Sequence, residues 1–180
     1  GFIIVNSDEM AALIVGIDEG LLNQPKEAFD AKAEQRMSIF QYLIGNTDFD
    51  LQMVRNVKLV RLTETDKLVP VPYDFDFALS VDADYAIANN NVGQLRISDR
   101  VYLGFERDNG ATRYMDVYYR SMQKTLEALI KDSKYINRSN RTHLLRVLNT
   151  YFADESVRNG IYVSGVEVEE LEAVESMIGK

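Results

Sequence analysis

The fold is decided by residues 44–59, IGNTDFDLQMVRNVKL, together with residues 69–77, VPVPYDFDF. Apolar and polar residues alternate over Val57–Leu62, which predicts a half-buried strand. Thr63–Lys67 is typical of a turn, and Leu68–Pro72 predicts a second strand, so the two strands should form a β-hairpin. The turn folds the second strand back beside the first. Residues just after the second strand should therefore lie near residues just before the first.

Acidic and amide side chains are concentrated at these two places. They are Asn46, Asp48, Asp50 and Asn56 before the first strand, and Asp74 and Asp76 after the second. Carboxylates brought this close together repel one another unless a cation neutralises them. Mg²⁺ suits such a place, because it takes a few carboxylate oxygens and leaves its other positions to water and phosphate.

The order of these residues is the order that phosphoryl transfer requires. That reaction uses a carboxylate to orient the attacking hydroxyl, and then an Asn and an Asp to hold Mg²⁺ against the nucleotide phosphates. Asp48, Asn56 and the pair Asp74-Phe75 follow each other in this order, with the predicted hairpin before the last.

A plainer interpretation stays open, because Asp and Asn residues also cap helices and turns. We expect Asn46 and Asp66 to do only that. Asp50 and Asp76 are either part of the site or solvated neighbours of it.

The segment FQYLIGNTD…RNVKL…VPYDFDF resembles the catalytic core of bacterial kinase-like proteins of HipA-like and CotH-like architecture. In particular, it is similar to a group of often exported proteins with the pattern IGNTDW…HNVKL…VPYDFD. The resemblance is specific over Phe40–Phe77 and looser over Val81–Phe105. It implies the helical C-terminal lobe of an atypical protein-kinase-like fold, and a longer protein whose N-terminal lobe is missing here.

The resemblance also implies a role for each matched residue. Asp48 corresponds to the catalytic Asp. Asn56 and Asp74 correspond to the residues that bind the cofactor, Mg²⁺ and ATP, and that act as metal ligands. Asp76 stands where a protein kinase has a Gly and would be a further metal ligand.

The sequence also departs from the kinase pattern. Seven residues separate Asp48 from Asn56, whereas ordinary kinase loops have about four. The loop must therefore bulge, or Asp50 must take one of the roles. Arg55 stands where the group has His. No GxGxxG motif and no strand Lys precede Asp48, and Lys58 lies on the wrong side of the loop for the usual role.

Upstream of this region, the sequence predicts a buried strand over Phe2–Val5, a helix from an N-cap at Ser7 to about Val15, and a loop over residues 16–24. Pro25 suits the first turn of a long helix that Gly45 ends. The expected buried face of this helix has apolar residues at helical spacing, namely Phe29, Ala33, Met37, Phe40 and Ile44.

Downstream, residues 74–94 show no clear period, and the asparagines at 89–91 are expected at an exposed tip. The rest predicts helix, with apolar stripes from Met115 to Leu129, from Leu144 to Phe152 and, more weakly and among acids, from Val166 to Met177. The predicted fold class is mostly α (α+β), a helical domain with a small β-hairpin. We expect a single domain over residues 1–180.

The composition excludes several classes of function. Of 180 residues, 46% are hydrophobic and 27% charged, which is typical of a folded globular chain. The net charge of −8, with Lys and Arg scattered singly, argues against nucleic acid as a partner. The lack of cysteine excludes disulfides and thiolate zinc sites. His143, the only histidine, cannot make a zinc site alone. No apolar run approaches the roughly 20 residues of a transmembrane segment.

The leading hypothesis is a Mg²⁺- and ATP-dependent phosphotransferase whose partners are a nucleotide and a hydroxyl acceptor of unknown identity. The alternative is a pseudokinase or binding module of an exported bacterial protein, without turnover. A purely structural helical domain is the third possibility. The resemblance implies a periplasmic or extracellular location, with the cytoplasm as the alternative.

Overall fold

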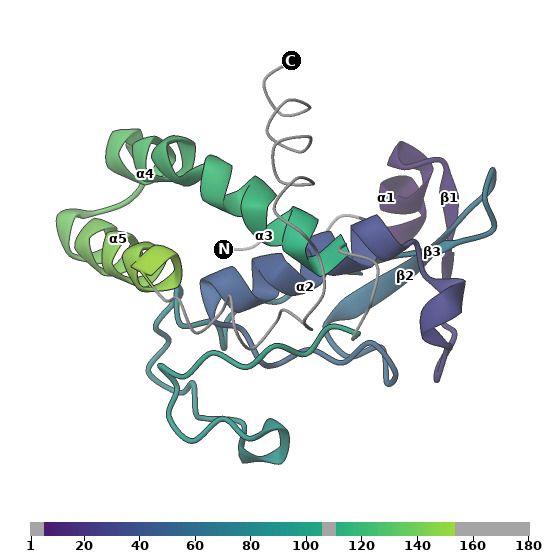
Figure 1. Cartoon of the computed structure of the whole chain (residues 1–180), viewed down its shortest axis with the longest axis horizontal. Helices are drawn as coiled ribbons and strands as arrows, with labels where there is room; N and C mark the ends of the chain where they lie inside the picture. Colours follow the sequence, from purple (N-terminus) through teal and green to yellow (C-terminus); the bar gives the residue numbers. More distant parts are fainter. Residues whose placement is uncertain (1–5, 106–110, 154–180) are drawn as a thin grey trace. The chain divides into compact units, whose positions relative to one another are not determined.

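The computed structural model describes residues 6–105 and 111–153 of the chain (Figure 1). The chain divides into two compact units, Gly1–Phe105 and Glu106–Lys180. The first unit combines helices with a sheet, and the described part of the second is helical, so the α+β class is confirmed. A single domain over residues 1–180 stays a prediction. None of the described helices is both long enough and apolar enough to cross a bilayer.

The first unit contains a three-stranded antiparallel sheet in the order β1-β2-β3. β2 (Val57–Leu62) and β3 (Leu68–Pro72) form the predicted hairpin, with the predicted bounds. The sheet is larger than a hairpin, because β1 (Gly16–Glu19) pairs with β2 where the sequence predicted a loop. Four residues are too few to show an alternation, and β1 gains its hydrogen bonds from a strand about forty residues away.

Helix α1 (Ser7–Leu13) begins one residue earlier than predicted. Asn6, not Ser7, is the N-cap, since its side-chain oxygen accepts from the amides of Asp8 and Glu9 at 2.8 and 3.3 Å. The helix ends at Leu13 rather than near Val15, whose φ of 56° cannot continue it. The strand predicted over Phe2–Val5 lies outside the described residues.

Helix α2 (Ala31–Ile44) is shorter than the predicted helix from Pro25. The 3₁₀ turn η1 (Lys26–Ala28) comes first, and Asp30 then caps α2 by accepting from the amide of Ala33 at 2.8 Å. A cap at Asp30 leaves Phe29 outside the helix, where it is buried in the core. That core joins α2 to the sheet and consists of Phe29, Met37, Phe49, Leu51, Val57, Leu59 and Leu68.

The buried surface of α2 is wider than the single apolar face that the sequence predicts. Glu34, Gln35 and Ser38 are also buried. The chain around Tyr102–Phe105 covers them: the Tyr102 hydroxyl donates to Gln35 Oε1 at 2.6 Å, and the amide of Phe105 donates to Glu34 Oε1 at 3.2 Å. A polar helix face can be buried when such partners satisfy it. Amphipathic periodicity cannot reveal this second contact.

Residues 73–105 contain a single short element, the 3₁₀ turn η2 (Asn90–Val92). The lack of period over residues 74–94 predicted this, but the helix expected after residue 94 is wrong for residues 95–105, which contain no helix. Asn90 and Asn91 are exposed, as expected for a loop tip, whereas Asn89 is half-buried. Asn89 is half-buried because it hydrogen-bonds Thr47 and Gln94.

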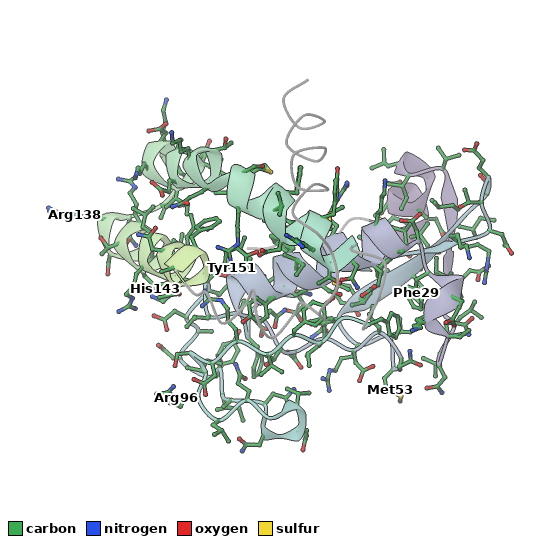
Figure 2. All side chains as sticks on the ribbon, in the orientation of Figure 1. Phe29, Met53, Arg96, Arg138, His143 and Tyr151 are labelled. Carbon is green, nitrogen blue, oxygen red and sulfur yellow. The ribbon has the colours of Figure 1, made fainter. Side chains whose placement is uncertain are left out.

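The described part of the second unit consists of α3 (Ala111–Ser121), α4 (Gln123–Asp132) and α5 (Arg138–Ala153). The predicted stripe from Met115 to Leu129 falls on two helices that meet at Met122 rather than on one. Tyr151, labelled on α5 in Figure 2, is fully buried and donates its hydroxyl to Asp116 Oδ1 at 2.6 Å. The stripe predicted over Val166–Met177 lies outside the described residues.

Candidate active site

The candidate site begins where α2 ends. Gly45 takes the left-handed conformation (φ 69°, ψ 39°) that turns the chain out of the helix, as predicted. A Cβ atom at this position would lie 2.7 Å from the Cβ of Leu79. The amides of Leu79 and Ser80 donate to the carbonyls of Gly45 and Ile44, both at 3.1 Å. The end of α2 is thus joined directly to the segment that follows Asp74 and Asp76.

Asn46 holds the backbone of Asp48 in place. Its Oδ1 accepts from the amide of Asp48 at 3.0 Å, and its Nδ2 donates to Gln41 Oε1 at 3.1 Å. Both Asn46 and Gln41 are almost fully buried. Asn46 therefore shapes a turn, as predicted, and that turn carries the candidate base.

The seven residues between Asp48 and Asn56 form a closed bulge. Asp50 and Arg55 exchange backbone hydrogen bonds at 3.0 Å in both directions. The Asp50 carboxylate accepts from the amides of Gln52 and Met53, both at 2.8 Å. Of the two alternatives for the long loop, the geometry therefore favours the bulge over a role for Asp50 in place of Asp48 or Asn56.

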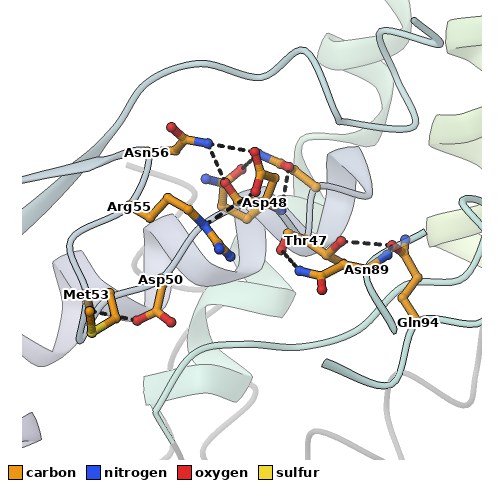
Figure 3. Close-up of polar contacts among 10 residues, drawn as sticks. Thr47, Asp48, Asp50, Met53, Arg55, Asn56, Asn89 and Gln94 are labelled. Carbon is orange, nitrogen blue, oxygen red and sulfur yellow. Dashed lines mark hydrogen bonds and ion pairs between the residues drawn. The ribbon is translucent and has the colours of Figure 1, made fainter. Parts of the chain in front are cut away.

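The bulge brings Asn56 against Asp48 (Figure 3). Asn56 Nδ2 donates to the carbonyl oxygen of Asp48 at 2.7 Å and to its Oδ2 at 2.8 Å. These two bonds fix the orientation of the amide. They leave Asn56 Oδ1 without a hydrogen-bond partner among the described residues. Asn56 has a φ of 53°, a conformation that Asn tolerates better than most residues.

Asp74 reaches the same place from the end of β3. The amide of Tyr73 donates to the carbonyl of Asn56 at 3.1 Å, so the residue before Asp74 is bonded to the residue before β2. Asp74 also has a positive φ, of 56°. Partial loss of hydration, the hydrogen bond with Asp76, and the negative charges of Asp76 and Asp48 raise the pKa of the Asp74 carboxyl. Asp74 is thus joined to Asn56 through Tyr73 and lies near enough to Asp48 for the charge of Asp48 to affect it.

Asp76 lies beside Asp74 and accepts from the hydroxyl of Tyr85 at 3.0 Å. This hydrogen bond is the main cause that raises the pKa of Tyr85. Between the two acids, the ring of Phe75 packs edge-on against Phe40 of α2, with centroids 5.9 Å apart. That contact anchors the acidic segment to the helix.

A second group of residues near Asp48 was not predicted from the sequence. We call it the clasp, and it consists of Thr47, Asn89 and Gln94. Gln94 is fully buried, and its Oε1 accepts from the Thr47 hydroxyl at 2.9 Å and from the amide of Asn89 at 2.8 Å. Asn89 Nδ2 donates to the carbonyl of Thr47 at 3.1 Å. Figure 3 shows the clasp on the side of Asp48 away from Asn56.

Arg55 forms an ion pair with the candidate base. Its Nε lies 3.3 Å from Asp48 Oδ1, and the two side chains are 50% and 30% exposed. Both carboxylate oxygens of Asp48 therefore have a partner, Oδ1 in Arg55 and Oδ2 in Asn56. The side chain still reaches solvent.

The donor set can be compared with what a cation requires. The described residues contain no group of three or more His, Cys, Asp or Glu side chains placed to hold a metal ion. The free amide oxygen of Asn56 and the carboxylate of Asp74 form a smaller set. Such a set fits Mg²⁺, which binds through one or two carboxylates and keeps water and phosphate as its other ligands.

A comparison with known families matches residues 18–166 to the family model described as "CotH kinase protein". The match covers most of the chain and includes every residue of the candidate site. No curated protein and no solved structure matches the chain.

Proposed function

The chain belongs to the CotH kinase family, and from this premise we propose that its first unit transfers the γ-phosphoryl group of ATP to a hydroxyl acceptor with the help of Mg²⁺. One observation carries the proposal: Asn56 is hydrogen-bonded to Asp48, and Asp74 directly follows the residue whose amide is bonded to the carbonyl of Asn56. We also propose that the unit corresponds to the C-terminal lobe of a kinase-like fold.

Asp48 is suited to orient the acceptor. Its backbone is held by Asn46 and its carboxylate by Asn56, so that its side chain does not have to be ordered when the acceptor arrives. At 30% exposure, the carboxylate can accept a hydrogen bond from a hydroxyl that comes from solvent.

Asn56 Oδ1 and the Asp74 carboxylate would hold the metal, with Asp76 as an additional ligand. A bound Mg²⁺ supplies positive charge that neutralises the nucleotide phosphates. Asp74 is already placed among negative charges that raise its pKa. A nearby cation opposes that effect, because it stabilises the ionised carboxylate.

A second candidate function is nucleotide binding without turnover, as in a pseudokinase or binding module of an exported protein. The observation that favours it is the engagement of both carboxylate oxygens of Asp48. In addition, β1, the one strand described before Asp48, carries no lysine that could contact the phosphates.

Thermal unfolding with Mg²⁺ and ATP, added separately and together, tests both candidates. We expect a rise in Tm of about 5–10 °C at a hundredfold excess of ligand over its dissociation constant, and only when both are present. Asp74→Asn should abolish the rise. Asp84→Asn, which removes an exposed carboxylate from the following loop, is the matched control and should retain it.

Transfer is then measured with γ-labelled ATP. Label on the chain or on an added acceptor, lost in Asp48→Asn, supports phosphotransfer. A Tm rise without transfer or hydrolysis supports the binding module. No rise with any combination of ligands rules out both functions for this chain.

A further inference from the structure

We propose that Arg55 is a catalytic residue whose guanidinium binds the phosphoryl group during its transfer to the acceptor. This inference rests on the phosphotransfer proposed above and adds a residue that the kinase pattern does not provide, since the resemblance places His at this position. Three features of Arg55 carry it: a fixed backbone, unused hydrogen-bond donors and its charge.

Hydrogen bonds fix the backbone of Arg55 next to the candidate base, Asp48. Its amide and carbonyl exchange hydrogen bonds with Asp50 at 3.0 Å, which closes the bulge. The residues on either side, Val54 and Asn56, both have a φ of 53°. For a β-branched residue such as Val54 this conformation is unusual and must be held by its surroundings. The bulge therefore directs the Arg55 side chain to Asp48.

The guanidinium of Arg55 has hydrogen-bond donors that Asp48 does not use. An arginine has five N–H groups in a planar fork that matches the oxygens of phosphate. Arg55 contacts Asp48 through Nε, and its two terminal nitrogens have no partner among the described residues. With half of the side chain exposed, these nitrogens are accessible to a ligand that approaches Asp48.

The charge of the site points to the same role. The carboxylates of Asp48, Asp74 and Asp76 all repel a polyphosphate. Of the described cationic side chains, Arg55 is the one that pairs with any of the three. An arginine that contacts both the base and the phosphoryl oxygens would hold the acceptor hydroxyl and the phosphorus atom next to each other.

The transfer step balances as follows. The acceptor oxygen forms a bond to the γ-phosphorus, and the bond from that phosphorus to the β–γ bridging oxygen breaks, so that ADP leaves with the electron pair. The hydroxyl proton passes to the Asp48 carboxylate. Arg55 stays protonated throughout and stabilises the negative charge on the phosphoryl oxygens.

Binding of two nucleotides to the full chain tests this role without a need for turnover. The probes are Mg²⁺ with AMP-PNP, which carries a γ-phosphoryl group and is not hydrolysed, and Mg²⁺ with ADP, which lacks it. We expect Arg55→Gln to weaken AMP-PNP binding about ten- to a hundredfold, as for loss of a charged hydrogen bond. It should weaken ADP binding less than about threefold. Arg55→Lys, which keeps the charge and loses the fork, should fall between.

Arg61→Gln is the matched control, since Arg61 lies at the far end of β2 and pairs with Glu19 at 2.9 Å. It should leave the affinity for both nucleotides unchanged.

Equal weakening of AMP-PNP and ADP binding in Arg55→Gln, or no weakening of either, would overturn the role of Arg55 while nucleotide binding stands. Failure of the unmodified chain to bind either nucleotide would overturn the proposed function, and the role of Arg55 with it. Melting of each variant without ligand checks its fold, and Arg55→Lys serves if Arg55→Gln does not fold.

Discussion

Single residues determine whether the candidate site can form, and Gly45 is the clearest case. It combines a left-handed backbone with a position where a Cβ would lie 2.7 Å from Leu79. We expect Gly45→Ala to lower the free energy of unfolding by about 2–4 kcal/mol, from backbone strain and crowding together. Gly93→Ala is the control, because Gly93 has a φ of 81° but nothing within 4 Å of the added Cβ. The Gly93→Ala substitution should lower the free energy of unfolding by about 1 kcal/mol, from backbone strain alone.

Urea unfolding of the two variants measures the difference. Equal losses would mean that crowding of the added Cβ against Leu79 contributes nothing to the loss at Gly45. Because Leu79 follows Asp74 and Asp76 closely, we also expect Gly45→Ala to weaken the response to Mg²⁺ and ATP.

The residues of the candidate site could be predicted from sequence to an uneven degree. The proximity of Asn56 and Asp74 was predictable because the β2–β3 hairpin lies between them, and hairpin geometry brings its two ends together. The position of Asp48 beside Asn56 depends on the bulge, and the roles of all three residues stay predictions. The cap of α1 was misassigned by one residue, since Asn6 and Ser7 are both good N-caps and only the backbone conformation decides between them. The ion pair of Arg55 with Asp48 depends on the shape of the bulge, which has no sequence signature.

At the scale of elements, the site depends on the clasp between the loop at Thr47 and the loop at 89–99. Gln94 uses its whole amide: Oε1 accepts two hydrogen bonds, and Nε2 donates to the carbonyls of Ile97 and Asp99 at 3.3 and 2.9 Å. Gln94→Leu keeps the volume and leaves buried polar groups unsatisfied. We expect it to lower the free energy of unfolding by about 2–4 kcal/mol and to speed amide exchange at Asp48.

The control for the clasp is Gln52→Leu. Gln52 is half-buried, and its side chain makes one hydrogen bond, to the carbonyl of Gln24 at 3.0 Å. The Gln52→Leu substitution should lower the free energy of unfolding by about 1 kcal/mol or less. If both variants lose the same free energy and amide exchange at Asp48 is unchanged in both, the clasp does not hold the candidate base.

Elements with a regular period were predictable, and those held by distant partners were not. β2 and β3 have the predicted bounds, whereas β1 was missed because its partner lies far along the chain. The clasp was missed for the same reason, since Asn89 and Gln94 lie in a stretch without period. Conversely, Pro25, which suits the first turn of a helix, and Phe29 at helical spacing made α2 look longer than it is.

At the scale of the whole molecule, every residue of the candidate site lies in the first unit, while the family match extends over much of the second. In the second unit, Asp116 of α3 is buried and accepts from Tyr151 of α5 at 2.6 Å and from Arg120 Nε at 2.8 Å. Tyr151→Phe removes one donor from this buried carboxylate. We expect it to lower the free energy of unfolding of the second unit by about 1–3 kcal/mol.

The same variant tests whether the candidate site belongs to the first unit alone. If it does, Tyr151→Phe should bind Mg²⁺ with AMP-PNP as tightly as the unmodified chain, at a temperature where both are folded. Tyr118→Phe is the control for loss of a hydroxyl, because Tyr118 is a half-buried tyrosine on α3. A loss of nucleotide affinity in Tyr151→Phe and not in Tyr118→Phe would contradict a site confined to the first unit, because the buried cluster around Asp116 would then contribute to binding.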